Sequence, residues 1–162
     1  MKNEVTEMQQ RLNYNRLAPA GIQAMANLNK FVEESELEHS LLELVKTRAS
    51  QINGCAYCID LHTKDARTLG ESEQRLYLLN AWREAPFYTD RERAALAWTE
   101  SITLVSESHA SDEDYAAARE QFSEQELVNL TLAIISINGW NRLAISFRAV
   151  PGNYESKRHA AN

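Results

Sequence analysis

The stretch of sequence that decides the fold is residues 123–148, SEQELVNLTLAIISINGWNRLAISFR. It opens with Ser123 and has Glu126 three residues later, which is the capping-box pattern that begins an α-helix. Apolar residues then recur so densely that they cover nearly the whole circumference of the predicted helix. A helix that is apolar all round has to be buried on all sides, so we expect its own chain or another subunit to cover it.

Helical signals also recur along the rest of the chain. Thr89 and Glu92 form a second capping box, residues 111–114 form a looser, acidic version, and Ser72 can cap a short helix. Only 5 glycines and 3 prolines occur in 162 residues, and neither Asn-Gly pair joins two alternating runs as a β-hairpin requires. The sequence therefore predicts an all-α fold, a compact single-domain bundle of about six to eight helices.

Length and charge limit the classes of protein to which the chain can belong. A chain of 162 residues corresponds to one domain of ordinary size, which we place at residues 17–150, after a polar leader (1–16) and before a flexible tail (151–162). The net charge of -6 argues against binding to nucleic acid or to an anionic membrane surface. No apolar run approaches the roughly 20 residues that span a bilayer, and the N-terminus is too polar for a signal peptide. We therefore expect a cytoplasmic location.

The residues with chemical potential lie together in residues 43–62, ELVKTRASQINGCAYCIDLH. Cys55 and Cys58 are the only cysteines, and their C-x-x-C spacing points to redox chemistry or metal binding in a reducing compartment. If Cys55 lies at the start of a helix, Cys58 and His62 share a face with it, and the helix N-terminus favours a thiolate. The imidazole can then take the thiol proton, and the second cysteine can close a disulfide with an oxidised sulfur.

Glu43 lies twelve residues before Cys55, on the preceding predicted helix. A sharp turn at Gly54 would bring the two helices side by side and allow Glu43 to approach His62. A carboxylate at the imidazole would fix its tautomer and raise its basicity, as the third member of a catalytic triad does. Because nothing local forces Glu43 inward, a solvated position on the helix surface is the alternative.

Two other functions fit the same residues. Cys55, Cys58 and His62 could bind zinc together with Glu43 or His39, although structural zinc cysteines usually lie in loop turns rather than leading into a helix. The cysteine pair could also belong to a thiol-disulfide redox protein or sensor that does not act on peroxides. The sequence contains no Gly-rich phosphate-binding loop and no dinucleotide fingerprint, so we expect no intrinsic cofactor.

The combination of Glu43, the C-x-x-C pair and His62 resembles the alkylhydroperoxidase (AhpD-like) branch of the carboxymuconolactone decarboxylase superfamily. Three longer stretches are also similar to that branch, so the resemblance covers most of the chain: LVKTRASQINGCAYCIDLHTKDARTLGES (44–72), TDRERAALAWTESIT (89–103) and INGWNRLAISFR (137–148). The resemblance implies a small all-α domain that assembles as trimers or hexamers and reduces hydroperoxides to alcohols through a cysteine pair. The decarboxylase branch lacks that pair, so decarboxylation is not the favoured activity.

The resemblance also implies a role for each site residue. Cys55 and Cys58 correspond to the redox pair, and His62 and Glu43 to the proton relay. We expect Cys58, activated by His62, to attack the terminal peroxide oxygen and Cys55 to resolve the sulfenic acid. The reverse order stays open, because Cys55 is nearer the helix start. An external dithiol, of the lipoyl type or on a thioredoxin-like protein, would reduce the resulting disulfide.

Tyr57 is the one departure from the pattern of the well-studied peroxidases of this branch. It lies between the two cysteines, where those members have a second histidine. A tyrosine can donate a hydrogen bond, but with a pKa of about 10 it is a poor proton acceptor near pH 7. We therefore expect Tyr57 to serve as an accessory donor or as a packing residue.

Overall fold

The computed structural model of the protein describes residues 8–157. In these residues the chain forms nine α-helices and one 3-10 turn and contains no β-strand, which confirms the all-α prediction. Two of the helices, α1 (Tyr14–Leu17) and α7 (Val105–Ser108), consist of only four residues. Turns this short carry no helical periodicity, which is why the sequence predicts fewer helices than the structure contains.

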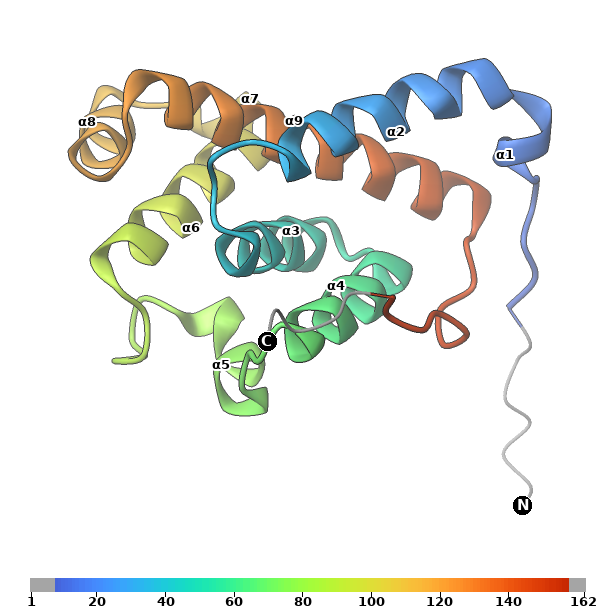
Figure 1. The fold of residues 1–162 in the computed structure, drawn as a ribbon, viewed down its shortest axis with the longest axis horizontal. Coiled ribbons are helices and arrows are strands. Elements are labelled where there is room, and N and C mark those ends of the chain that lie inside the picture. The colour runs from blue at the N-terminus through green and yellow to red at the C-terminus, as the bar shows by residue number, and fades with distance from the viewer. Residues whose placement is uncertain (1–7, 158–162) are drawn as a thin grey trace.

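Helix α3 (His39–Asn53) occupies the centre of the molecule (Figure 1). Every residue from 41 to 47 is buried, and this run contains a glutamate and a lysine. α3 is therefore the helix that needs polar partners inside the protein. The helices that pack directly against it are α4 (Ala56–Thr68), α6 (Asp90–Thr103) and α9 (Glu124–Phe147).

Helix α9 is not buried on all sides. It packs on α3 and on α2 (Pro19–Glu33), but Val128, Ile135 and Ile145 expose 60%, 50% and 46% of their surfaces. Within one chain the coverage of α9 is therefore incomplete, because α2, α3 and α6 pack against only part of its circumference. Coverage by another subunit stays a prediction. In the described part of the chain, no helix, α9 included, has the length and apolarity to cross a membrane.

The connection between α3 and α4 is as short as the sequence predicts. Gly54 has a backbone φ of 68°, in the left-handed region that glycine adopts readily, and its N–H ends α3 by donating to the carbonyl oxygen of Gln51. Cys55 follows directly as the N-cap residue of α4, where its Sγ accepts a hydrogen bond from the backbone N–H of Cys58 at 3.4 Å. As a result, α3 and α4 lie side by side.

Four further helices begin at the predicted capping residues. The capping boxes that start at Thr89 and Ser123 both form, at the beginnings of α6 and α9. Ser72 and Ser111 cap the two shorter helices that the sequence also predicts. The bounds of the elements not yet given are α5 (Glu73–Tyr77), the 3-10 turn η1 (Leu79–Ala81) and α8 (Asp112–Gln121).

The described parts of both terminal segments are attached to the helices. Before α1, the backbone N–H of Arg11 donates to the carbonyl oxygen of Phe147 at 2.9 Å, and its guanidinium donates to the carbonyl oxygen of Ser146 at 3.1 Å. After α9, the Tyr154 hydroxyl donates to Asp65 Oδ1 at 2.8 Å. The division of the chain into a leader, a domain and a flexible tail stays a prediction. Residues 1–7 of that leader and 158–162 of that tail lie outside the described residues.

Ser123→Ala is expected to lower the free energy of unfolding by about 1 kcal/mol, because the first turn of α9 loses the oxygen that accepts the N–H of Glu126. Urea unfolding followed by circular dichroism measures this change. Ser106→Ala, at an exposed position inside α7, is the control and should change the free energy by less than about 0.5 kcal/mol. Equal losses in the two variants would contradict the capping argument.

Candidate active site

Cys55 and Cys58 lie at the N-terminus of α4, as the sequence predicts. Both are free thiols, and only 1% and 4% of their surfaces are exposed. The unpaired N–H groups of the first helical turn favour negative charge at this position. The N–H of Cys58 makes this contact directly, since it donates to Cys55 Sγ. The helix start therefore provides the Cys55 sulfur with surroundings that stabilise a thiolate.

The two thiols share one proton unequally. The pKa of Cys55 is lowered to about 7, chiefly because the Cys58 thiol donates a hydrogen bond to its sulfur; burial opposes the shift, and the Cys58 N–H and the Asn141 side chain add to it. The pKa of Cys58 is raised, because the same hydrogen bond retains its proton and because the thiol is buried. Near neutral pH the negative charge therefore rests on Cys55, and Cys58 carries the proton.

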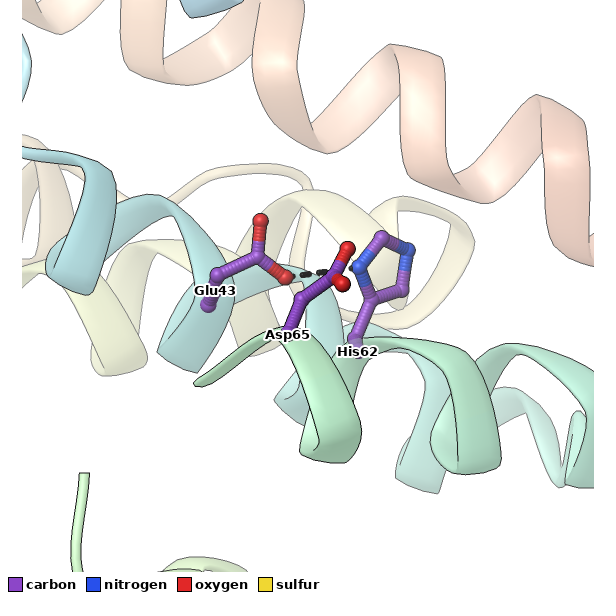
Figure 2. Close-up of side chains that lie close together, drawn as sticks. All are labelled: Glu43, His62 and Asp65. Atoms are coloured by element: carbon purple, nitrogen blue, oxygen red, sulfur yellow. Dashed lines mark hydrogen bonds and ion pairs between the residues drawn. The ribbon is translucent and has the colours of Figure 1, made fainter. Parts of the chain in front are cut away.

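Glu43 and His62 meet, although 19 positions separate them in the chain. Figure 2 shows Glu43 reaching from α3 toward the imidazole of His62 on α4. His62 Nδ1 lies 2.8 Å from Glu43 Oε2, and because a carboxylate accepts, this contact assigns the proton to Nδ1 and leaves Nε2 as the basic nitrogen. Glu43 is completely buried, so the alternative of a solvated glutamate is wrong.

Two further charged residues complete this buried group. Lys46 Nζ donates to Glu43 Oε1 at 3.2 Å and also forms an ion pair with Glu33 at the end of α2. Because Lys46 is 2% exposed, these carboxylates rather than water balance its charge. Sequence reasoning missed both residues. A lysine three positions after Glu43 in an apolar run is a usable signal, since the two share a helix face, but no local pattern points to Glu33.

Asp65 lies one turn after His62 on α4 and points toward the same place (Figure 2). Potential metal-ligating atoms of Glu43, His62 and Asp65 lie within 4.8 Å of one another, the one such group of three in residues 8–157. Each of these side chains already has a hydrogen-bond partner inside the protein. Neither cysteine belongs to the group, and His39 lies beside Glu33 at 3.2 Å, so the zinc site considered from the sequence is not assembled.

A cavity of about 320 Å³ opens beside the cysteine pair. Cys58 and His62 line it, whereas Cys55 borders a separate hollow of about 180 Å³. Its walls come mainly from α1, α2, α4 and α9 and are mostly apolar, and its size suits a small organic molecule. A larger hollow of about 670 Å³ lies over another face of α4, beside α5, and none of the four predicted catalytic residues lines it.

Two tyrosines line the cavity that Cys58 faces. Tyr57 is the predicted accessory residue; burial, followed by the charges of Cys58 and Asp60, raises the pKa of its phenol. The pKa of Tyr14 is raised by burial and by the neighbouring Tyr57 and cysteines. Both hydroxyls therefore stay protonated at neutral pH and can donate. Sequence reasoning missed Tyr14, because a contact between the N-terminal segment and α4 leaves no local signal.

Comparison with known proteins connects this site to a family. Residues 18–101 match the model of the carboxymuconolactone decarboxylase family. The uncharacterized protein YdfG of Bacillus subtilis (strain 168) is 46% identical over 139 residues, which cover 86% of this chain and 95% of YdfG. The chain belongs to the carboxymuconolactone decarboxylase family.

Solved structures confirm the resemblance of this family member to the AhpD-like branch. ATU0492 from Agrobacterium tumefaciens, a protein of unknown function named as a candidate AhpD-type antioxidant defence protein, is 42% identical. It superposes with a TM-score of 0.87, and the match covers 90% of this chain and 100% of ATU0492. The debrominase Bmp8 has a TM-score of 0.76, with coverage of 85% of this chain and 74% of Bmp8. At 19% identity, Bmp8 shows a shared fold alone.

Lys46→Met is expected to destabilise the protein by about 3–5 kcal/mol, because it removes one partner of a buried ion pair and leaves the charge of Glu43 uncompensated. Lys30→Met is the matched control. Lys30 pairs with Glu34 on the surface, and losing that pair should cost at most about 1 kcal/mol. Urea unfolding at neutral pH measures both variants. A loss for Lys46→Met as small as that of the control would show that Lys46 does not hold Glu43.

The ultraviolet thiolate absorbance of the reduced protein is expected to rise as the pH passes upward through about 7, where Cys55 loses its proton. Cys58→Ala removes the thiol that donates to Cys55, so the midpoint should move up toward the ordinary cysteine value of about 8.5. Cys58→Ser retains a donor at that position and should keep much of the shift. An identical midpoint in the wild type and in Cys58→Ala would contradict the shared proton.

Proposed function

We propose that this protein is a thiol-dependent peroxidase that reduces organic hydroperoxides to alcohols through Cys55 and Cys58. The observation that carries the proposal is the cavity, which presents the Cys58 sulfur and the His62 imidazole to the same small molecule. The AhpD-type name of ATU0492, at 42% identity, adds support. The cysteine pair supports peroxide chemistry more than the fold does, because one fold can carry several chemistries.

In the first step Cys58 attacks the terminal oxygen of the hydroperoxide. Its proton moves to Cys55 along the hydrogen bond between the two thiols, so that the negative charge passes to the sulfur that faces the cavity. An S–O bond forms while the O–O bond breaks, and the electron pair of that bond leaves on the alkoxide oxygen. His62 carries the proton from the cysteine pair to the alkoxide, which gives the alcohol and a sulfenic acid on Cys58.

Glu43 and Lys46 are positioning residues for this proton transfer. Because Nδ1 of His62 donates to Glu43, the basic Nε2 is the nitrogen that can exchange protons with the cysteine pair and the substrate. Lys46 binds the other carboxylate oxygen and holds Glu43 in the orientation that His62 requires. The contacts from Lys46 to Glu43 and from Glu43 to His62 are therefore in place before a substrate enters the cavity.

In the second step Cys55, again a thiolate, attacks the sulfur of the Cys58 sulfenic acid. A Cys55–Cys58 disulfide forms, and hydroxide leaves and takes a proton from solvent to become water. An external dithiol, of the lipoyl type or on a thioredoxin-like protein, then reduces the disulfide by thiol-disulfide exchange. That exchange returns both thiols and completes the cycle.

We also propose that the protein works as a homo-oligomer, a trimer or a hexamer. The apolar residues of α9 that one chain leaves uncovered, Val128, Ile135 and Ile145, are the surface that such an assembly would bury. Apolar side chains with half of their surface in water gain free energy when a neighbouring copy covers them.

A thiol count tests the proposed function. Fully reduced, metal-free protein is treated with one equivalent of cumene hydroperoxide, and its free thiols are counted before and after. We expect the wild type to lose both thiols and to form a Cys55–Cys58 disulfide, detected by mass. Cys55→Ser should consume one equivalent and stop at the sulfenic acid. Cys58→Ser should react no faster than free cysteine, because it lacks the sulfur that faces the cavity.

Three results would change this picture. The opposite pattern in the two serine variants would make Cys55 the attacking residue. If the wild-type thiols survive as long as free cysteine does at the same pH, the protein is not a peroxidase, and a thiol-disulfide protein or sensor becomes the better function. Oxidation that occurs once and does not cycle with an added dithiol would also favour a sensor.

A further inference from the structure

The N-terminal segment supplies one wall of the cavity that Cys58 faces. Tyr14 lies in α1, ahead of the residues that match the family model, 18–101. Its side chain nevertheless lines the cavity together with Cys58 and His62. The other walls come from α2, α4 and α9 and from Lys46 of α3. Tyr14 therefore approaches a molecule in the cavity from a helix that carries none of the predicted site residues.

Contacts on both sides of Tyr14 hold it in place. Its ring packs against Phe147, with the ring centroids 5.9 Å apart. The backbone of Arg11 is bonded to the carbonyl oxygen of the same phenylalanine, and the Asn13 side chain accepts the N–H of Arg16 at 3.1 Å to begin α1. The phenol is therefore presented to the cavity by a fixed backbone rather than by a loose end of the chain.

The Tyr14 hydroxyl is a protonated donor with no acceptor among residues 8–157. Tyr77, Tyr88 and Tyr154 each donate to an oxygen atom of the protein. In the described part of the chain the hydroxyl of Tyr14 has no such acceptor. Burial and the nearby cysteines raise its pKa, so it keeps its proton at neutral pH. A hydroxyl of this kind can donate to an oxygen atom of a bound substrate.

We propose that Tyr14 is a further catalytic residue, which donates a hydrogen bond to the leaving oxygen of the hydroperoxide as the O–O bond breaks. This inference rests on the proposed function. Displacement at oxygen needs the attacking sulfur, the terminal oxygen and the leaving oxygen roughly in line. The leaving oxygen then lies beyond the terminal oxygen from the Cys58 sulfur, inside the cavity that Tyr14 and His62 both line. The Tyr14 hydroxyl can donate to it there while His62 delivers the proton.

The electron and proton balance of the step shows what Tyr14 contributes. The S–O bond forms with the electron pair of the Cys58 thiolate, and the pair of the broken O–O bond collects on the leaving oxygen. The proton that completes the alcohol comes from the cysteine pair through His62, and Tyr14 keeps its own proton throughout. Its hydrogen bond stabilises negative charge that is present on the leaving oxygen only during the transfer, which is the kind of interaction that accelerates a reaction.

Single-turnover kinetics of the reduced protein with two peroxides test this role. The alkoxide that leaves tert-butyl hydroperoxide is strongly basic and needs a donor, whereas the acetate that leaves peracetic acid is weakly basic and does not. Tyr14→Phe should slow the reaction with tert-butyl hydroperoxide by about 10²-fold, the usual cost of losing one such donor, and should leave the peracetic acid rate nearly unchanged. The thiolate titration of this variant should match that of the wild type.

Tyr115→Phe is the matched control, because Tyr115 lies on α8 against Trp98 and does not line the cavity. It should react with both peroxides at wild-type rates. Equal slowing of both peroxides in Tyr14→Phe, or no slowing relative to Tyr115→Phe, would overturn the role of Tyr14 while leaving the peroxidase intact. A wild type that reduces neither peroxide faster than free cysteine would overturn the proposed function, and the role of Tyr14 with it.

Discussion

A carboxylate without access to water, that of Glu43, is the constraint on which the rest of the structure depends. An unpaired charge in a protein interior costs several kcal/mol, so the fold has to bring a cation and hydrogen-bond donors to it. Lys46 comes from the same helix and His62 from the next one, and Glu33 on α2 balances the remaining charge of the lysine. The same contacts that keep α2, α3 and α4 together therefore orient the imidazole, so stability and proton transfer depend on one group of atoms.

The separation along the chain between interacting residues decides how much of this arrangement could be predicted from the sequence. The helix starts at Thr89 and Ser123 and the turn at Gly54 depend on residues within four positions of each other, and all three form as predicted. The contact between Glu43 and His62 could be predicted because one short turn joins their helices. The partners of Lys46 on α2 and the place of Tyr14 in the cavity wall depend on helices that only the completed fold brings together. What covers α9 could not be predicted for the same reason, since the sequence shows which faces of a helix are apolar and not what lies against them.

The spacing of the two cysteines does not show which of them carries the negative charge at rest. The direction of the hydrogen bonds between them does. In the sequence, the helix start favours charge on Cys55 and the neighbouring histidine favours activation of Cys58, and nothing weighs one effect against the other. In the structure the Cys58 thiol and N–H both point to Cys55, so the resting charge and the sulfur that faces the cavity belong to different residues. The Cys58 sulfur, which faces the cavity, therefore remains a thiol at rest. A thiol is a poor nucleophile, so Cys58 reacts with an electrophile only when its proton is transferred to Cys55.

None of residues 8–17 is fully buried, so this segment contributes little of the apolar packing that stabilises the bundle, yet it closes one side of the cavity. Exchanges there can change the shape and polarity of the cavity while the buried charges of α3 remain as they are. Substitutions in residues 8–17 can therefore change substrate preference with little loss of folding stability. These residues lie outside the segment that matches the family model, 18–101. For protein engineers the same stretch is a region where a library of variants can alter selectivity without first having to restore folding.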